Sequence, residues 1–153
     1  MSPETQSILN DRLRIMTDEL RSLLANYLFG VYRKCLSNAY FTCHHAVTLL
    51  LEGKDLSAGD REALNKRFNA HFVKPGLVDK QLLKSLEKLE SQQLAADYRG
   101  YLLFDEDDVH ESLKLALPFL EEMLRYIQQN LADCEWELFA QRLDGVKRLL
   151  PQS

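Results

Sequence analysis

The sequence lacks paired cysteines. Cys35, Cys43 and Cys134 are odd in number, lie far apart in the chain and include no CxxC pair. This usage predicts a reducing, cytoplasmic setting rather than a disulfide framework. Cys43 falls on an apolar helical stripe, so we expect it to be a small buried hydrophobe.

Long apolar runs are also missing. The longest apolar clusters, such as residues 47–51, are far too short to cross a bilayer. The first residues, MSPETQSILNDRLR, are polar and carry no signal-peptide apolar run. We therefore expect no contact with a membrane and a cytoplasmic location.

The chain has no excess of positive charge. Nineteen Lys and Arg side chains are outnumbered by 23 Asp and Glu, for a net charge of −4. This balance argues against a protein that coats DNA or RNA non-specifically. A local basic patch remains possible on these grounds, because a few converging cations are enough to bind phosphate.

No strand-period run, internal repeat or low-complexity segment is present in the 153 residues. Apolar residues instead recur every three or four positions, as in amphipathic helices. This pattern is interrupted at Gly30, Gly53 and the Lys74-Pro75-Gly76 run. Pro118 should either kink its helix or mark the start of a new one. We predict one all-α domain over residues 1–153, an up-and-down bundle with short connections. Its helices should cover residues 4–27, 32–51, about 60–72, about 80–98, 109–131 and 135–150.

Residues 32–51 form the helix around which the rest should pack. Small and apolar residues at Leu36, Ala39, Cys43, Val47 and Leu50 form a single stripe along it. Its second half carries the only adjacent histidines of the chain, residues 44 and 45. If the protein performs chemistry, this helix is the expected place for it.

Two segments resemble the HEPN family, the higher eukaryotes and prokaryotes nucleotide-binding domains. Residues 37–46, SNAYFTCHHA, are similar to the family stretch SRAYYAAFHA. Residues 72–77, FVKPGL, and residues 96–98, ADY, match the family elements FVKPGL and RxxADY. The resemblance covers roughly residues 18–127, and the last helix lies outside the family pattern.

The resemblance implies a bundle of four to five main helices, with the last helix as an addition, and commonly a homodimer. Many HEPN proteins are metal-independent ribonucleases, often toxins paired with a minimal nucleotidyltransferase. Their catalytic motif is an Arg followed, after four to six residues, by a His. The histidine corresponds to His45, but Asn38 stands at the arginine position. The arginine of the second element is likewise replaced, by Gln93.

Metal-independent RNA cleavage needs a proton acceptor, a proton donor and a cation. His45 could transfer protons near neutral pH. Asn38 lies two helical turns away on the same face, where it could hydrogen-bond a phosphate but could not neutralise charge. The family pattern makes Asp97 an orienting partner. The alternative is that His45 is a structural polar residue satisfied by a neighbouring helix.

Further residues could bind RNA or a nucleotide. We expect no metal and no cofactor, because Cys43 and the adjacent histidines diverge on the helix and no second ligand pair has the spacing of a zinc site. The basic residues could equally form a solvated face, and Tyr98 with Asp97 could simply anchor the end of a helix. The candidate binding residues are Arg33, Lys34, Tyr40, His44, Lys74 and Tyr98.

Three alternatives follow from these observations. The first is a HEPN-family protein of a toxin–antitoxin or defence system that cleaves RNA with a degenerate motif. The second is a non-catalytic module that binds a nucleotide, a minimal nucleotidyltransferase or a second copy of itself. A helical adaptor with only accidental resemblance is a third. Convergence of His45, Asn38 and a cation in an open cleft would favour the first function.

Overall fold

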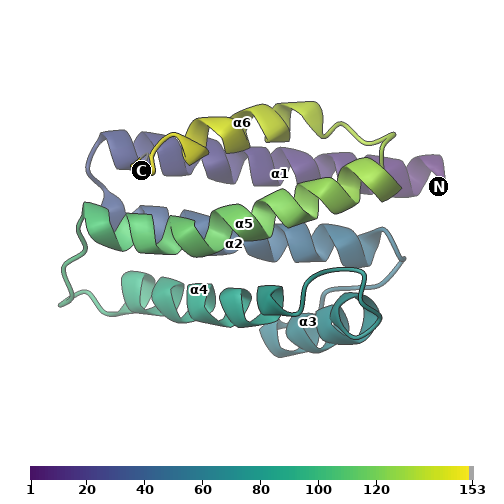
Figure 1. Cartoon of the computed structure of the whole chain (residues 1–153), viewed down its shortest axis with the longest axis horizontal. Helices are drawn as coiled ribbons and strands as arrows, with labels where there is room; N and C mark the ends of the chain where they lie inside the picture. The colour runs from purple at the N-terminus through teal and green to yellow at the C-terminus, as the bar shows by residue number, and fades with distance from the viewer. Residues whose placement is uncertain (152–153) are drawn as a thin grey trace.

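The computed structural model describes residues 1–151 as an all-helical bundle (Figure 1). The predicted domain reaches residue 153, and its last two residues lie outside the described range. The chain runs back and forth along the long axis of the bundle, so successive long helices are antiparallel neighbours. The elements are α1 (Pro3–Leu28), α2 (Tyr32–Glu52), α3 (Arg61–Phe68), the π-helical η1 (Asn69–Val73), α4 (Gln81–Tyr98), α5 (Glu106–Asn130) and α6 (Glu137–Lys147).

Local sequence explains where these helices begin and end. Ser2 accepts a hydrogen bond from the Thr5 backbone N–H at the start of α1, and Asp60 accepts one from Ala63 at the start of α3. Asp105 and Asp108 form a reciprocal capping box at the start of α5. Gly30 has φ +75, a left-handed conformation that ends the α1 segment and reverses the chain.

Two details differ from the sequence-based expectation. From its place before the fourth predicted helix, Asp79 is expected to be the N-cap of that helix. Asp79 accepts a hydrogen bond from the Gln81 backbone N–H at 2.8 Å, but the N-cap position of α4 is Lys80, whose side chain makes no capping hydrogen bond. Pro118 does not mark a restart, because α5 continues through it from Glu106 to Asn130. Pro118 is exposed, so its ring meets solvent instead of the core.

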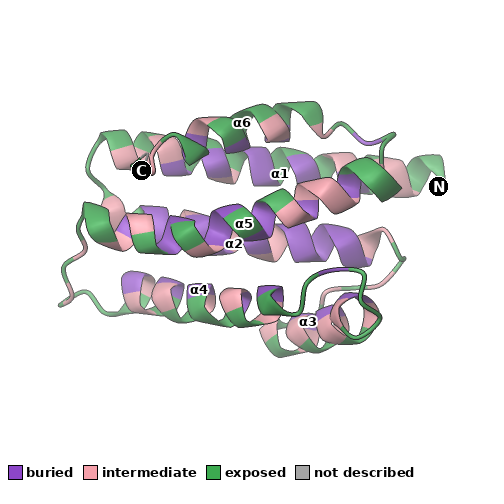
Figure 2. Cartoon of the chain, viewed as in Figure 1, coloured by how far each residue is buried: buried purple, intermediate pink, exposed green. Residues whose placement is uncertain are grey.

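The core lies around α2, which packs against α1, α3, α4 and α5 (Figure 2). All three cysteines are buried, as expected for Cys43. The extra helix α6 lies along α1 and also contacts α5. None of the helices in residues 1–151 combines the length and the hydropathy that a membrane span requires. The structure therefore confirms an all-α bundle with α2 at its centre.

Candidate functional site

His45 lies on the side of α2 that faces α1, where it meets an arginine. Arg12 of α1 donates a hydrogen bond from Nη1 to Nδ1 of His45 at 3.0 Å. The same guanidinium donates from Nε to Oε1 of Glu52 at 2.8 Å. Glu52 is seven residues after His45, two turns along the same face of α2. We call Arg12, His45 and Glu52 the His45 cluster.

The hydrogen bond from Arg12 determines the tautomer of His45. A guanidinium has donors only, so Nδ1 must accept and the proton of the neutral ring must be on Nε2. Burial, the Arg12 charge and the neighbouring His44 together lower the pKa of His45 to about 4. The imidazole is therefore neutral around pH 7.

An aromatic group lies beside this cluster. Arg61 of α3 stacks over the ring of Tyr40 at 4.8 Å and over Phe41 at 5.5 Å. The Tyr40 hydroxyl is 3.4 Å from Nδ1 of His44. Burial, followed by the charges of Arg61 and Arg12, lowers the pKa of His44. Arg61 is also 3.8 Å from a carboxylate oxygen of Glu90, so this cation has a counter-charge.

Asn38 also faces α1, but it does not join the His45 cluster. Its side-chain oxygen accepts a hydrogen bond from Asn26 at 2.9 Å, and its amide donates to Glu19 at 3.0 Å. Burial raises the pKa of Glu19. Asn38 therefore connects α2 to the second half of α1, while His45 connects α2 to the first half.

Asp97 belongs to α4 and contacts the side of α2 that faces α4. Its carboxylate accepts hydrogen bonds from the Ser37 hydroxyl at 3.1 Å and from the Gln93 amide at 2.6 Å. The structure thus brings Asp97 to Ser37, the residue before Asn38, and not to Asn38 or His45. Adjacent positions of a helix point about 100° apart, which explains the separation.

The predicted binding residues do not form one surface. Arg33 donates to the carbonyl oxygens of Ala96, Arg99, Gly100 and Leu102 and stacks over Phe104 at 4.9 Å. Arg33 therefore secures the end of α4 and the connection to α5. Tyr40 is fully buried and Tyr98 is highly exposed.

The two exposed lysines of the prediction lie far apart. Lys34 is in the first turn of α2, at the end of the bundle where α1 connects to α2. Lys74 follows η1 at the opposite end, where the chain passes from α3 to α4. Both side chains are exposed. The two ends of the bundle cannot contribute to one phosphate site.

The sequence analysis did not identify Arg12 and Glu52 as part of the site. Glu52 could have been found, since it follows His45 by seven residues in the same helix. Arg12 could not, because it belongs to another helix and its contact depends on how the two helices pack. Within the described residues, no group of three or more His, Cys, Asp or Glu could hold a metal ion.

Comparison with known proteins gives one informative similarity. No protein-family model matches the chain. A UPF0332 protein of Thermotoga maritima is 27% identical over 117 residues, which are 76% of this chain and 86% of that protein. That name states no activity. The match covers most of both chains, so the similarity is not confined to a local motif.

Proposed function

We propose that this chain is a HEPN-like helical module of a toxin–antitoxin or defence system that binds a protein partner and does not itself cleave RNA. The partner would be a second copy or a minimal nucleotidyltransferase. The contact of Arg12 with both His45 and Glu52 is the observation that carries the proposal. It uses the groups of the degenerate motif to join α1 to α2.

Each part of the cleavage chemistry is weak in this arrangement. The Nδ1 of His45 already accepts a hydrogen bond from Arg12, so this nitrogen is not free to accept a proton from a substrate. With a pKa of about 4, the ring does not hold the second proton that an acid needs near neutral pH. Glu52 neutralises Arg12, Asn38 carries no charge, and Asp97 contacts another face of α2.

The assignment to the HEPN type rests on the resemblance of residues 37–46, 72–77 and 96–98. The helical bundle agrees with the fold that this resemblance implies. The similarity to the UPF0332 protein extends over most of the bundle. These observations support a shared scaffold, while the altered motif supports a role in binding instead of catalysis.

One observation favours a ribonuclease as the second candidate. Arg12 brings a guanidinium to His45, so the Arg–His pair that α2 lacks on its own is present across α1 and α2. In this reading Arg12 would leave Nδ1 to contact a phosphate, and His45 would accept the proton of the 2′-hydroxyl. The partial exposure of the Arg12 and Glu52 side chains, 24% and 18%, is compatible with such a movement.

An RNA cleavage assay separates the two candidates. The purified wild-type chain is incubated with mixed-sequence RNA and a chelator, beside the variants His45→Ala and Arg12→Ala. The proposal expects intact RNA in all three reactions. Cleavage by the wild type that is lost in both variants would overturn it in favour of the ribonuclease.

The structural role of the cluster has its own measurement. Arg12→Ala should lower the free energy of unfolding by about 1–3 kcal/mol, because it leaves the half-buried Glu52 and His45 without their donor. Arg14→Ala is the matched control, since Arg14 is 62% exposed and its pairs are at the surface. The Arg14→Ala change should lower the free energy of unfolding by at most about 1 kcal/mol. Equal losses in urea unfolding would contradict a structural role for the cluster.

A further inference from the structure

One end of the bundle exposes an unusual number of large apolar side chains. The connection from α1 to α2 and the connection from α4 to α5 both lie at this end (Figure 1). Leu103 is 94% exposed, Phe29 85%, and Tyr98 and Tyr101 79% each. We call these four residues, together with Leu28 and Val31, the end surface.

The apolar area that the end surface exposes is comparable to the largest apolar patch of a typical monomer. An aromatic side chain contributes roughly 150–250 Å² of surface, so the three exposed rings alone leave on the order of 500 Å² at this end. The largest apolar patch of a typical monomer is about 300–600 Å² and is often functional. The leucines and Val31 enlarge the patch further, so the end surface is a candidate for binding.

The two connections are held in place by hydrogen bonds and stacking. Arg33 joins them, because it donates to carbonyls of the α4–α5 connection while it belongs to the first turn of α2. The Tyr27 hydroxyl donates to Glu106 and lies 3.1 Å from Nε2 of His110. A surface that is already ordered loses little conformational entropy when it binds.

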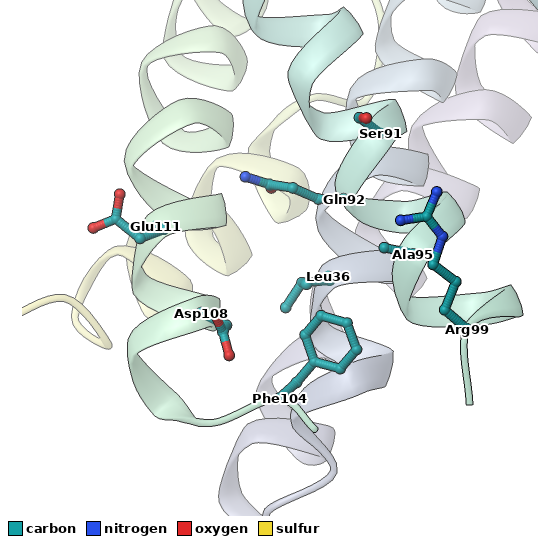
Figure 3. A pocket seen from close by; sticks show the side chains of 8 residues that line it. All are labelled: Leu36, Ser91, Gln92, Ala95, Arg99, Phe104, Asp108 and Glu111. Carbon is teal, nitrogen blue, oxygen red and sulfur yellow. The ribbon is translucent and has the colours of Figure 1, made fainter. Parts of the chain in front are cut away.

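A cavity adjoins this surface. It has a volume of about 270 Å³ and is lined by Leu36, Ser91, Gln92, Ala95, Arg99, Phe104, Asp108 and Glu111. Figure 3 shows the ring of Phe104 between Asp108 of α5 and Arg99 at the end of α4. The volume is just below the range of about 300–1,000 Å³ that is usual for small-molecule sites. It suits a single long side chain, with Leu36 and Phe104 against its aliphatic part and Asp108 near its head.

Charge around the end surface restricts what can bind. Four consecutive carboxylates, residues 105–108, follow Phe104 directly, and Glu111 lies one turn further. The exposed cations nearby are Lys34, Lys114 and Arg99, and Arg99 also lines the cavity. The half-buried Arg33 stacks over Phe104. The capping box occupies Oδ2 of Asp108, and Lys114 pairs with Oε1 of Glu111. The acidic excess disfavours nucleic acid and also a second copy, whose identical acidic edge would be repelled.

We propose that the end surface binds a basic amphipathic helix of a partner protein. Apolar side chains of that helix would cover Phe29, Tyr101 and Leu103, and one of its Lys or Arg side chains would enter the cavity beside Asp108. This is the helix-in-groove mode of recognition, with apolar anchors and complementary charge. The inference rests on the proposed function, because it names the surface and the partner chemistry of the module.

A labelled model peptide tests this directly. The probe is a fluorescein-labelled helical peptide with leucines on one face and lysines on the other. The control peptide is identical except that glutamates replace the lysines. Fluorescence anisotropy should show binding of the lysine peptide, weakened by added salt. The glutamate peptide should bind at least about tenfold more weakly. Equal affinity for the two peptides would overturn the inference.

Variants locate the binding. Leu103→Asp and Asp107→Lys should each weaken binding of the lysine peptide about tenfold. The matched controls Leu138→Asp and Glu137→Lys place the same changes on α6, and circular dichroism checks the folding of all four. If the control variants weakened binding of the lysine peptide as much as the variants of the end surface, the end surface would not be the binding site. A wild-type dimer that Leu103→Asp dissociates would identify a second copy as the occupant instead.

The result of the peptide experiment can be told apart from the result of the RNA cleavage assay. The variants of the end surface leave Arg12, His45 and Glu52 unchanged. RNA cleavage by the wild type would overturn the proposed function whatever the peptide result. Intact RNA together with equal binding of both peptides would leave the proposed function standing and remove only this surface.

Discussion

The imidazole of His45 accepts a hydrogen bond from an arginine that lies 33 positions earlier in the chain. That contact changes the chemistry of the residue. A free histidine near its ordinary pKa can exchange protons at neutral pH. In this environment burial is the largest cause of a lowered pKa, and the charge of Arg12 adds to it. A histidine in a matching motif position is thus converted into an acceptor in a structural contact.

The lowered pKa predicts how stability depends on pH. The pKa of His45 is about 4 in the folded state, and the ordinary value is near 6.5. Between these values the unfolded chain binds more protons than the folded one. The contribution of His45 to stability is therefore complete above pH 6.5 and is lost as the pH falls towards 4. His44, whose pKa is also lowered, acts in the same direction.

A His45→Asn variant tests this prediction. An asparagine oxygen can accept from Arg12 but does not titrate, so the decline in the free energy of unfolding between pH 6.5 and 4 should be shallower than in the wild type. Urea unfolding at several pH values measures both proteins. Carboxylates titrate in both, so their effect cancels in the comparison. Parallel curves would show that His45 does not carry the dependence.

At the scale of the elements, α2 is joined to its neighbours by polar contacts on two different faces. Asn38 and His45 connect it to α1, while Ser37 connects it to Asp97 of α4. Arg33 extends this second connection beyond the end of α4. A guanidinium with five donors in a rigid fork can satisfy several carbonyl oxygens at a helix end, and an ammonium group cannot cover the same positions.

Arg33→Lys should therefore loosen the connection between α4 and α5. Backbone amides of residues 98–104 should exchange with solvent about tenfold faster, because the carbonyls of Ala96 and Leu102 lose their shared donor. Hydrogen exchange measured by mass spectrometry reports this segment. Arg99→Lys changes an exposed arginine of the same segment and should have little effect. If both variants exchange alike, Arg33 does not order the connection.

At the scale of the whole molecule, α6 is part of the core and not an appendage. It packs along α1 through buried apolar residues, namely Phe139, Leu143 and Val146. Cys134 is buried in the segment that leads into it. The buried apolar residues of the described chain form one cluster that includes this helix. We therefore expect α6 to unfold together with the rest of the bundle.

Two neighbouring residues of α6 provide the test. Phe139 is fully buried, so Phe139→Ala should lower the free energy of unfolding by about 3–5 kcal/mol. Leu138 is 51% exposed, and Leu138→Ala should change it by no more than about 0.5 kcal/mol. Thermal and urea unfolding should each remain a single transition. If α6 unfolded in a separate transition at lower temperature or urea concentration, it would not belong to the cooperative unit. The same would follow if Phe139→Ala left the free energy of unfolding unchanged.

Most of the fold could be predicted from the sequence, because helix periodicity and caps are local properties. The ranges expected for α1 and α2, residues 4–27 and 32–51, differ from the structure by one residue at most at each end. Asn38 and His45 also share the face of α2 that their spacing predicts, since both meet residues of α1. Contacts across helices could not be predicted in this way. They depend on the rotation and offset of one helix against another.

The sequence by itself determined an all-α bundle, a central helix 32–51 and a His45 motif without its arginine on that helix. These follow from patterns within single segments, where neighbours in the chain are neighbours in space. Only the tertiary structure decided that Arg12 contacts His45, that Asp97 faces away from it and that Arg33 is committed to carbonyl oxygens. Each of these depends on packing between helices, which brings together residues that no local spacing relates.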